Sequence, residues 1–356
     1  MSSSSTTEYD AFLLVSFGGP EGPDEVMPFL ENVVRGRNVP RARLEAVAEH
    51  YQHFGGRSPI NEQNRALIAA LEGEFRTHGI ELPIYFGNRN WRPYLVDALR
   101  QMQADGVRRA LGLFTSVFTC YSSCRQYRED VEAARREIGD AAPEVCKLPP
   151  FFDHPGFIEA VADRVRAALK QIPEARRAAA PLVFTTHSIP RAMADRSAYE
   201  AQFAETSRRV AEAVGHARWQ LAYQSRSGPP SQSWLEPDVR DVLAGKGVGS
   251  LYPGEASGGP SQIKTPDPFT HVVVVPIGFL SDHVEMLWDL DTEARAHAER
   301  LGLGMVRAAT VGTHPRFVAM IRELVAERIE GREQPRPLDV SDPCGEVCPP
   351  DCCLPG

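Results

Sequence analysis

The sequence predicts an α/β protein made of two Rossmann-like, doubly wound domains with parallel sheets and a cleft between them. Short, continuous apolar runs alternate with longer amphipathic stretches along the chain. An unbroken apolar run is typical of a strand that is buried on both faces of a parallel sheet, and strand–helix alternation over this length favours an α/β fold. The same order runs twice, which predicts two similar halves. Two open α/β halves leave a crevice at the carboxyl ends of their strands, so any chemistry is expected just after the apolar runs.

The expected strands and helices follow in order along the chain. We expect strands at residues 12–17, 83–87, 110–118, 182–186, 220–223 and 271–279. Amphipathic periodicity predicts helices at residues 64–78, 94–102, 126–138, 156–172 and 204–214.

Composition shifts predict the domain boundaries. Residues 1–9 are polar and lack the apolar core of a secretory signal, so we expect a disordered tail. Residues 10–165 and 166–330 form the two predicted domains, and residues 331–356 form a cysteine-rich tail that binds a metal centre. Residues 245–269, rich in Gly, Pro and Ser, predict a flexible surface excursion.

Charge and hydropathy exclude two classes of partner. The 356 residues carry a formal net charge of −8, so no basic surplus is available to neutralise nucleic-acid phosphates. No apolar run reaches the roughly 18 residues that a membrane span requires. We therefore expect a cytoplasmic protein without integral membrane association, and we expect it to be a monomer.

An acidic row follows the last expected strand. Glu285, Asp289 and Glu293 are spaced four apart, which places three carboxylates on one face of a helix. Oxygen ligands of this kind suit divalent metals such as Fe²⁺. The alternative is a solvated acidic helix face opposite Leu287 and Leu290.

Polar side chains also follow two other expected strands. His187 ends an apolar run and can accept a proton near neutral pH, although it could equally be a hydrogen-bonded histidine in a strand-to-helix turn. Cys120, Ser122 and Cys124 come just after another run, where they either line the same cleft or cap the following helix. The turn at residues 17–20 lacks the glycine spacing of a dinucleotide site, and we expect it to let the backbone approach a flat ligand.

The seven cysteines predict a metal centre. An odd count without an export signal argues against a disulfide framework. Cys344, Cys348, Cys352 and Cys353 crowd into the last thirteen residues. Three or four thiolates this close fit an iron–sulfur cluster, and zinc is the alternative.

Taken in order, several motifs resemble the ferrochelatase family over most of the chain. They lie at residues 12–20, 54–60, 85–89, 186–190, 223–229 and 276–285. The chain most resembles the actinobacterial branch, which is similar to enzymes that metallate coproporphyrin III rather than protoporphyrin IX. The resemblance implies a lyase of haem biosynthesis that takes a porphyrin and Fe²⁺ as substrates, with a downstream enzyme of that pathway as a candidate partner.

The resemblance also implies site residues. His187 matches the family's active-site histidine and Glu285 its partner acid, both close to the substrate Fe²⁺, while Asp289 and Glu293 continue an acidic path for iron or protons. Phe17 stands where relatives commonly have Tyr or Met, and it cannot supply a metal ligand. The remaining residues implied in porphyrin binding are Arg35, Arg37 and Ser122.

Relatives that carry a [2Fe–2S] cluster use three C-terminal cysteines and one from the body of the protein. By resemblance, Cys344, Cys348 and Cys353 are the three tail ligands, and Cys348 and Cys353 reproduce the family's last spacing. Cys124 is the favoured fourth ligand and Cys120 is the alternative.

Three rival functions follow from the same residues. A chelatase for Co²⁺ or Ni²⁺ would use more histidines at the metal. A haem or metal carrier would not need an acid and a base on either side of the ring. An iron–sulfur redox protein would leave the large cleft unexplained.

Overall fold

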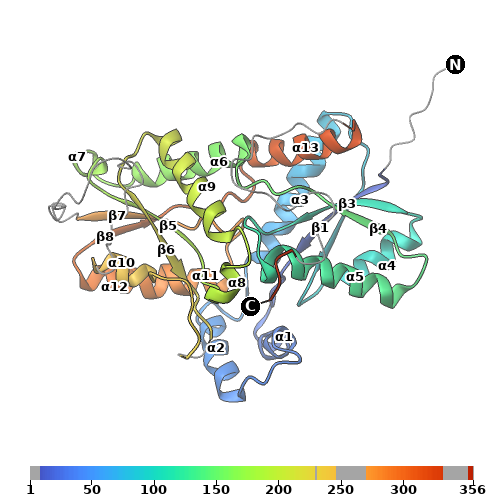
Figure 1. Ribbon diagram of the computed structural model, residues 1–356, viewed down its shortest axis with the longest axis horizontal. Helices are drawn as coiled ribbons and strands as arrows, with labels where there is room; N and C mark the ends of the chain where they lie inside the picture. The colour runs from blue at the N-terminus through green and yellow to red at the C-terminus, as the bar shows by residue number, and fades with distance from the viewer. Residues whose placement is uncertain (1–8, 229–230, 246–269, 332–351, 356) are drawn as a thin grey trace.

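The computed structural model describes residues 9–228, 231–245, 270–331 and 352–355. It contains two four-stranded sheets of matching order, β2-β1-β3-β4 and β6-β5-β7-β8, in which every strand pair is parallel. Figure 1 shows the two sheets side by side. The predicted α/β fold with parallel sheets is confirmed. The strands are β1 Ala11–Ser16, β2 Ile84–Asn88, β3 Arg109–Phe114, β4 Glu144–Lys147, β5 Leu182–His187, β6 Trp219–Gln224, β7 His271–Val275 and β8 Gly304–Arg307.

The sequence analysis missed β4 and β8, which are the short strands at one edge of each sheet. Each has four residues and mostly half-buried side chains, so neither shows an apolar run. Both nonetheless pair in register with a central strand, β4 with β3 and β8 with β7.

Helices cover both faces of the first sheet, as a doubly wound fold requires. Ala11, Leu13 and Val15 of β1 pack with apolar residues of α4 and α5. Phe12 and Leu14, which point to the opposite face, pack with α3. This alternation follows from the period of two along a strand, and it explains why β1 is buried at every position and apolar up to Val15.

The helices lie between the strands in sequence. Their bounds are α1 Val26–Val33, α2 Arg41–His53, α3 Ile60–Thr77, α4 Leu95–Ala104, α5 Gln126–Ile138, α6 Pro155–Leu169, α7 Glu174–Arg177, α8 Arg191–Ala194, α9 Tyr199–Val214, α10 Val239–Leu243, α11 Val284–Leu287, α12 Arg295–Arg300 and α13 Pro315–Ile329. A 3₁₀ turn, η1 Pro23–Glu25, and two π-helical segments, η2 Tyr121–Arg125 and η3 Trp288–Ala294, complete the described elements.

Helices α6 and α13 form a seam that joins the two sheets. Each follows the edge strand of its own sheet, and each begins after a histidine whose side chain accepts a hydrogen bond from the backbone two residues on. His154, which caps α6, faces Glu323 of α13 at 3.8 Å, and His314, which caps α13, faces Asp163 of α6 at 3.5 Å. Each acid lies nine residues after the histidine of its own helix (154 to 163, and 314 to 323). The seam is therefore two-fold symmetric in its polar contacts.

Aromatic packing follows the same symmetry at the centre of the seam. The rings of Phe157 and Phe317 are both fully buried and lie 6.2 Å apart, and Phe151 contacts both. One continuous apolar core surrounds them and takes residues from β1 and β3 as well as from β5 and β7. Figure 1 shows α6 and α13 running along one side of both sheets. The two halves therefore share a core and are not separate globules.

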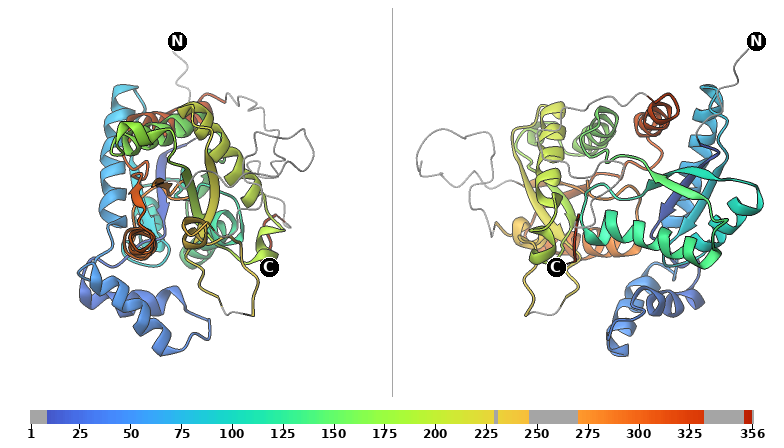
Figure 2. Two further views of the ribbon diagram at one scale, coloured as in Figure 1. Left: turned by 90° about the vertical axis from the view of Figure 1, so that its left-hand side faces the viewer. Right: turned by 45° about the vertical axis from the view of Figure 1, so that its right-hand side comes forward.

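Helices α1 and α2 form a small unit that projects from the opposite side of the molecule, as the right-hand view of Figure 2 shows. Phe29 and Leu30 of α1 pack against Leu44 and Ala48 of α2, and Trp91 closes this small core.

The glycine turn after β1 packs closely against the rest of the protein. Gly18 has φ +84° and leaves no room for a side chain, because a Cβ there would lie 2.8 Å from the Cβ of Asn88. At Gly19 a Cβ would lie 2.7 Å from that of Ser58. The glycines are thus required by contacts within the protein, and the expectation that this turn lets the backbone approach a flat ligand stays a prediction.

The domain boundaries stay a prediction. The boundary expected at residues 165/166 falls inside α6, which packs against both α9 and α13. Tyr9, placed in the expected tail, is buried with the Arg109 guanidinium over its ring. Residues 246–269 of the expected excursion, and most of the cysteine-rich tail, lie outside the described residues. Within the part that is described, no helix is both long and apolar enough to cross a membrane.

Phe317→Ala should destabilise the protein, because it leaves a cavity at the centre of the seam. We expect a loss of about 3–5 kcal/mol in the free energy of unfolding, measured from denaturant midpoints. Leu301→Ala is the control, since Leu301 is 44% exposed and should change stability by no more than about 0.5 kcal/mol. Equal effects of the two substitutions would show that the seam does not hold the halves together.

Candidate active site

The candidate site lies at the carboxyl ends of β5 and β7. The two strands pair in parallel, with Leu182 opposite Val273, so their carboxyl ends meet at one edge of the sheet. His187 is the last residue of β5, and the loop after β7 leads into α11, which carries Glu285. The fold therefore brings together two residues that are about a hundred positions apart in the sequence.

His187 and Glu285 face each other with Nε2 and Oε1 3.6 Å apart. The other ring nitrogen, Nδ1, donates a hydrogen bond to the Ser188 carbonyl. Both nitrogens thus face acceptors, which favours the doubly protonated imidazolium. Burial opposes that charge, but the Glu285 carboxylate and the Ser188 carbonyl outweigh it and raise the pKa of His187. For Glu285, burial acts in the other direction, and the pairing with His187 prevails and lowers its pKa. The two groups form an ion pair.

Asp289 is the group in the site that titrates near neutrality. Burial, followed by the charge of Glu285, raises its pKa from 3.8 to about 7. The Ser225 hydroxyl donates a hydrogen bond to Asp289 Oδ2 and partly offsets this rise. Ser225 holds the left-handed conformation, φ +62°, that is unusual for a residue other than glycine. Strain of this kind is often found at functional sites.

Glu293, the last acid of the row, is hydrogen-bonded on both carboxylate oxygens. Its two carboxylate oxygens accept hydrogen bonds from Arg240 Nη1 and Trp288 Nε1, each at 3.2 Å. The sequence analysis placed the three acids on one face of a regular helix. The structure instead changes from α-helix at Glu285 to the π-helical segment η3 at Asp289 and Glu293. The wider turn is a local irregularity of the kind that frequently marks functional sites.

Two histidines near this row were not singled out from the sequence as site residues. His283 is half-buried two positions before Glu285, and burial lowers its pKa. His50 of α2 stacks on Trp288 with ring centroids 4.0 Å apart and planes inclined by 9°. Burial also lowers the pKa of His50. His283 lies within the motif that carried the resemblance, but no sequence pattern signals a contact between α2 and η3.

Contacts from α2 and α3 connect the halves beside the site. His50 stacks on Trp288, the ring of His53 lies 5.5 Å from that of Trp288, and the Asp282 backbone donates a hydrogen bond of 2.8 Å to Gln63 Oε1 of α3. Arg307 of β8 forms an ion pair with Asp282 and a second one with Asp291. These interactions fix the loop before Glu285 against the first half.

The implied porphyrin-binding residues lie in the first half. Phe17 is 38% exposed, with its ring edge toward Phe29. Arg35 and Arg37 are exposed after α1, and Ser122 is exposed in η2.

The cysteines separate into two environments. Cys124, Cys352 and Cys353 pack together in one buried cluster. Cys120 belongs to the main core instead, where its sulfur lies 3.3 Å from the hydroxyls of Ser122 and Ser123. Burial raises the pKa of the Cys120 thiol, which disfavours the thiolate that iron requires. The described tail thus meets Cys124 and not Cys120.

Two of the implied tail ligands, Cys344 and Cys348, lie outside the described residues. Among the residues that are described, no three His, Cys, Asp or Glu side chains are arranged to hold a metal ion. Cys352, treated as an extra thiol in the sequence analysis, lies with its sulfur 3.5 Å from that of Cys353. The donor set at this position is nevertheless made of buried thiols, the type that iron–sulfur clusters use.

Known proteins resemble this chain over most of its length. The ferrochelatase family model matches residues 9–248 and 263–329. A ferrochelatase of Rhodopirellula baltica is 54% identical over 346 residues, which cover 97% of this chain and 93% of that protein. A coproporphyrin III ferrochelatase of Nocardia farcinica is 49% identical over 363 residues, covering 97% of each chain. Among solved structures, SirB from Bacillus subtilis with Fe³⁺ is 15% identical with a TM-score of 0.52, covering 90% of this chain and 97% of that one, and it shows the shared fold alone.

Asp289→Asn should change how stability depends on pH. Because the folded protein raises the pKa of Asp289 from 3.8 to about 7, it favours the neutral carboxyl, and this contribution to stability is lost as pH rises through that interval. Asparagine stays neutral. The free energy of unfolding of the variant relative to wild type should therefore increase from pH 4 to pH 7 and level off above it, as measured by urea unfolding.

Asp24→Asn provides the control, because Asp24 is exposed in η1, outside the site. A wild-type-to-D289N difference that stays constant from pH 4 to pH 8 would contradict the raised pKa.

Proposed function

Because the chain belongs to the ferrochelatase family, we propose that it inserts Fe²⁺ into coproporphyrin III to form coprohaem in haem biosynthesis. The observation that carries the proposal is the His187–Glu285 pair at the carboxyl edge of the second sheet. The choice of porphyrin is supported by relatives that are named coproporphyrin III ferrochelatases, one of them in Streptomyces coelicolor at 48% identity.

Metallation requires that two pyrrole N–H protons leave the ring while Fe²⁺ loses its water. The site supplies a nitrogen base and carboxylates within a few ångströms of one another. In the substrate-free protein both ring nitrogens of His187 face acceptors, and its raised pKa favours the doubly protonated form. That form must release a proton before His187 can accept one from the porphyrin. Glu285, whose lowered pKa keeps it ionised, is the acceptor available at once.

Asp289 is suited to receive the proton that leaves this pair. A group with a pKa of about 7 exchanges protons readily in both directions at neutral pH. It lies between the ion pair and Glu293, which accepts a hydrogen bond from Arg240. We infer that protons pass along Glu285, Asp289 and Glu293. The substrate Fe²⁺ favours the same carboxylates and would displace their protons as it arrives.

The first half supplies the groups that would bind the rim of the porphyrin. Coproporphyrin III carries carboxylates, and exposed guanidinium groups are good partners for them. Arg35 and Arg37 are exposed, and the Ser122 hydroxyl can add a hydrogen bond. Phe17 offers an exposed aromatic edge for contact with the ring, without a metal ligand.

We further propose that the tail binds a [2Fe–2S] cluster through Cys124, Cys344, Cys348 and Cys353. The buried cluster of Cys124, Cys352 and Cys353 supports Cys124 as the ligand from the body of the protein, and it adds Cys352 as a candidate in place of one tail cysteine. When bound, the cluster would supply iron–thiolate bonds that connect the tail to the body. Metal insertion is not a redox reaction, so we infer a structural or regulatory role. Location in the cytoplasm, a monomeric state and product transfer to a downstream enzyme stay predictions.

Anaerobic turnover tests the proposed activity. With Fe²⁺ and each porphyrin offered separately, the Soret band should report faster metallation of coproporphyrin III than of protoporphyrin IX. His187→Ala should abolish turnover while porphyrin binding, measured by fluorescence quenching, remains. His271→Ala is the matched control. His271 is the first residue of β7, so it lies at the amino end of the strand and away from the carboxyl ends that form the site.

Preference for protoporphyrin IX would overturn the choice of substrate but not the activity. Tight binding of finished haem without metallation of either porphyrin would identify a carrier, and normal turnover by the His187 variant would refute its catalytic role.

Cys124→Ser should abolish the visible absorbance and the reduced-state EPR signal of the cluster, because it removes the body ligand. Cys120→Ser should leave both unchanged, since the Cys120 sulfur lies in the main core among serine hydroxyls. The two substitutions are chemically identical and only four residues apart. The opposite pattern would make Cys120 the ligand.

A further inference from the structure

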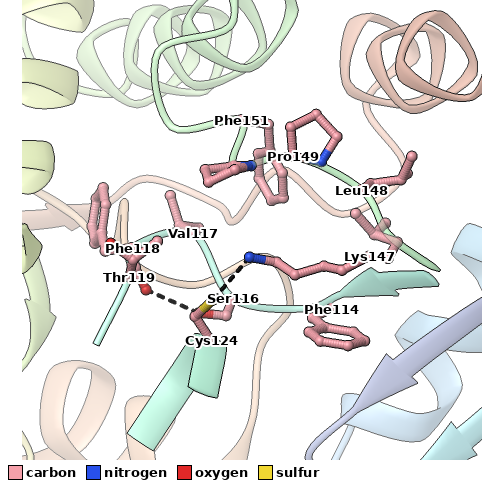
Figure 3. Close-up of a pocket in the computed structure, with 12 residues that line it drawn as sticks. Phe114, Ser116, Val117, Phe118, Thr119, Cys124, Lys147, Leu148, Pro149 and Phe151 are labelled. Carbon is pink, nitrogen blue, oxygen red and sulfur yellow. Dashed lines mark hydrogen bonds between the residues drawn. The ribbon is translucent and has the colours of Figure 1, made fainter. Parts of the chain in front are cut away.

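A lysine contacts the cysteine that we propose as the body ligand of the cluster. Lys147 Nζ lies 2.8 Å from Cys124 Sγ. Lys147 is the last residue of β4, and Cys124 lies in η2, just after β3. Since β3 and β4 pair in parallel, their carboxyl ends bring the two side chains to the same edge of the first sheet. Figure 3 shows the lysine chain reaching across to the sulfur.

The surroundings strengthen this contact. The pocket that contains it has mostly apolar lining residues, among them Leu113, Val117 and Phe151. Its free volume of about 10 Å³ has room for about one water molecule and is far too small for a porphyrin. A hydrogen bond from an ammonium group to sulfur is stronger where little water screens it. The cavity therefore belongs to the cysteine cluster and not to the porphyrin site.

The residue type is also informative. The chain has 39 basic residues, of which only four are lysines, at positions 147, 170, 246 and 264. An ammonium is a compact point charge that can direct one N–H at a single sulfur, whereas a guanidinium is a planar fork suited to two oxygens. Close to this contact an arginine binds an oxygen instead, because Arg125 Nη1 donates a hydrogen bond of 2.6 Å to the Cys352 carbonyl.

We propose that Lys147 is a positioning residue for the iron–sulfur cluster, whose ammonium donates a hydrogen bond to the Cys124 sulfur and thereby stabilises the reduced cluster. The inference rests on the proposed cluster. Taking up one electron from an external reductant adds one negative charge to the cluster and its four thiolates. A cation that donates to a ligating sulfur stabilises this added charge and raises the reduction potential. Lys147 thus sets how readily the cluster accepts an electron.

The test is a mediated redox titration of the anaerobically purified holoprotein, with dithionite as reductant and the visible band and EPR signal as readouts. Lys147→Met removes the donor and the charge, and we expect a more negative midpoint potential. Lys147→Arg keeps the charge but not the geometry of the ammonium, and its midpoint potential should lie between those of the Met variant and wild type. Lys170→Met is the matched control, because Lys170 is exposed at the end of α6, and its potential should equal that of wild type.

The outcomes separate the two proposals. Wild-type protein that never shows cluster absorbance, even after reconstitution with iron and sulfide, refutes the cluster and this inference with it. A cluster present in wild type and in Lys147→Met with the same midpoint potential overturns the role of Lys147 alone. If the Met variant loses its cluster, Lys147→Gln, which keeps a neutral donor, carries the test. An intermediate potential then supports the proposal, and a wild-type potential refutes it.

Discussion

The arrangement of the whole site depends on the packing of α6 against α13. The candidate acid–base groups, His187 and Glu285, are carried by the second sheet, whereas the implied porphyrin-binding residues are carried by the first. A cleft between two independent domains would open and close freely, because interfaces within a chain are usually small and polar. Here one apolar core runs through both sheets, and the crossed pairs of His154 with Glu323 and His314 with Asp163 close its edges. The seam therefore fixes the spacing between the two sets of residues, together with the contacts beside the site.

Parallel pairing explains why the functional residues are sequence neighbours of strands. In a parallel sheet all carboxyl ends point to the same edge, so short segments that follow separate strands converge without long loops. His187 follows β5, the loop to Glu285 follows β7, and Ser225 follows β6. In the first sheet, the same rule brings Cys124 and Lys147 together after β3 and β4. The candidate active site and the Cys124–Lys147 contact thus arise in the same way, at the carboxyl ends of parallel strands in the two halves of the chain.

The burial of each strand in its sheet determines how much of the fold could be predicted from the sequence. Central strands such as β1 and β7 bury every residue or nearly so, and their apolar runs predicted the fold and the positions of His187 and Glu285. The edge strands β4 and β8 were not predicted, because each has four mostly half-buried residues that form no apolar run. The π-helical turn at Asp289 escaped because a spacing of four indicates an α-helix. Contacts between distant elements, such as His50 with Trp288 or Cys352 with Cys124, depend on tertiary packing and have no local signal.

The electrostatics of the acidic row differ from what its sequence suggests. Three carboxylates spaced four apart read as three negative charges, yet each has a different state near pH 7. Glu285 is ionised and balanced by His187, Asp289 is partly protonated, and Glu293 is held by Arg240. Of the three acids, only Asp289 holds a proton near pH 7, and it becomes a better metal ligand as that proton leaves it, so we expect iron entry and proton release to be coupled at this carboxylate. That coupling is what metal insertion into a porphyrin requires, because the ring must lose its two protons as it takes the metal.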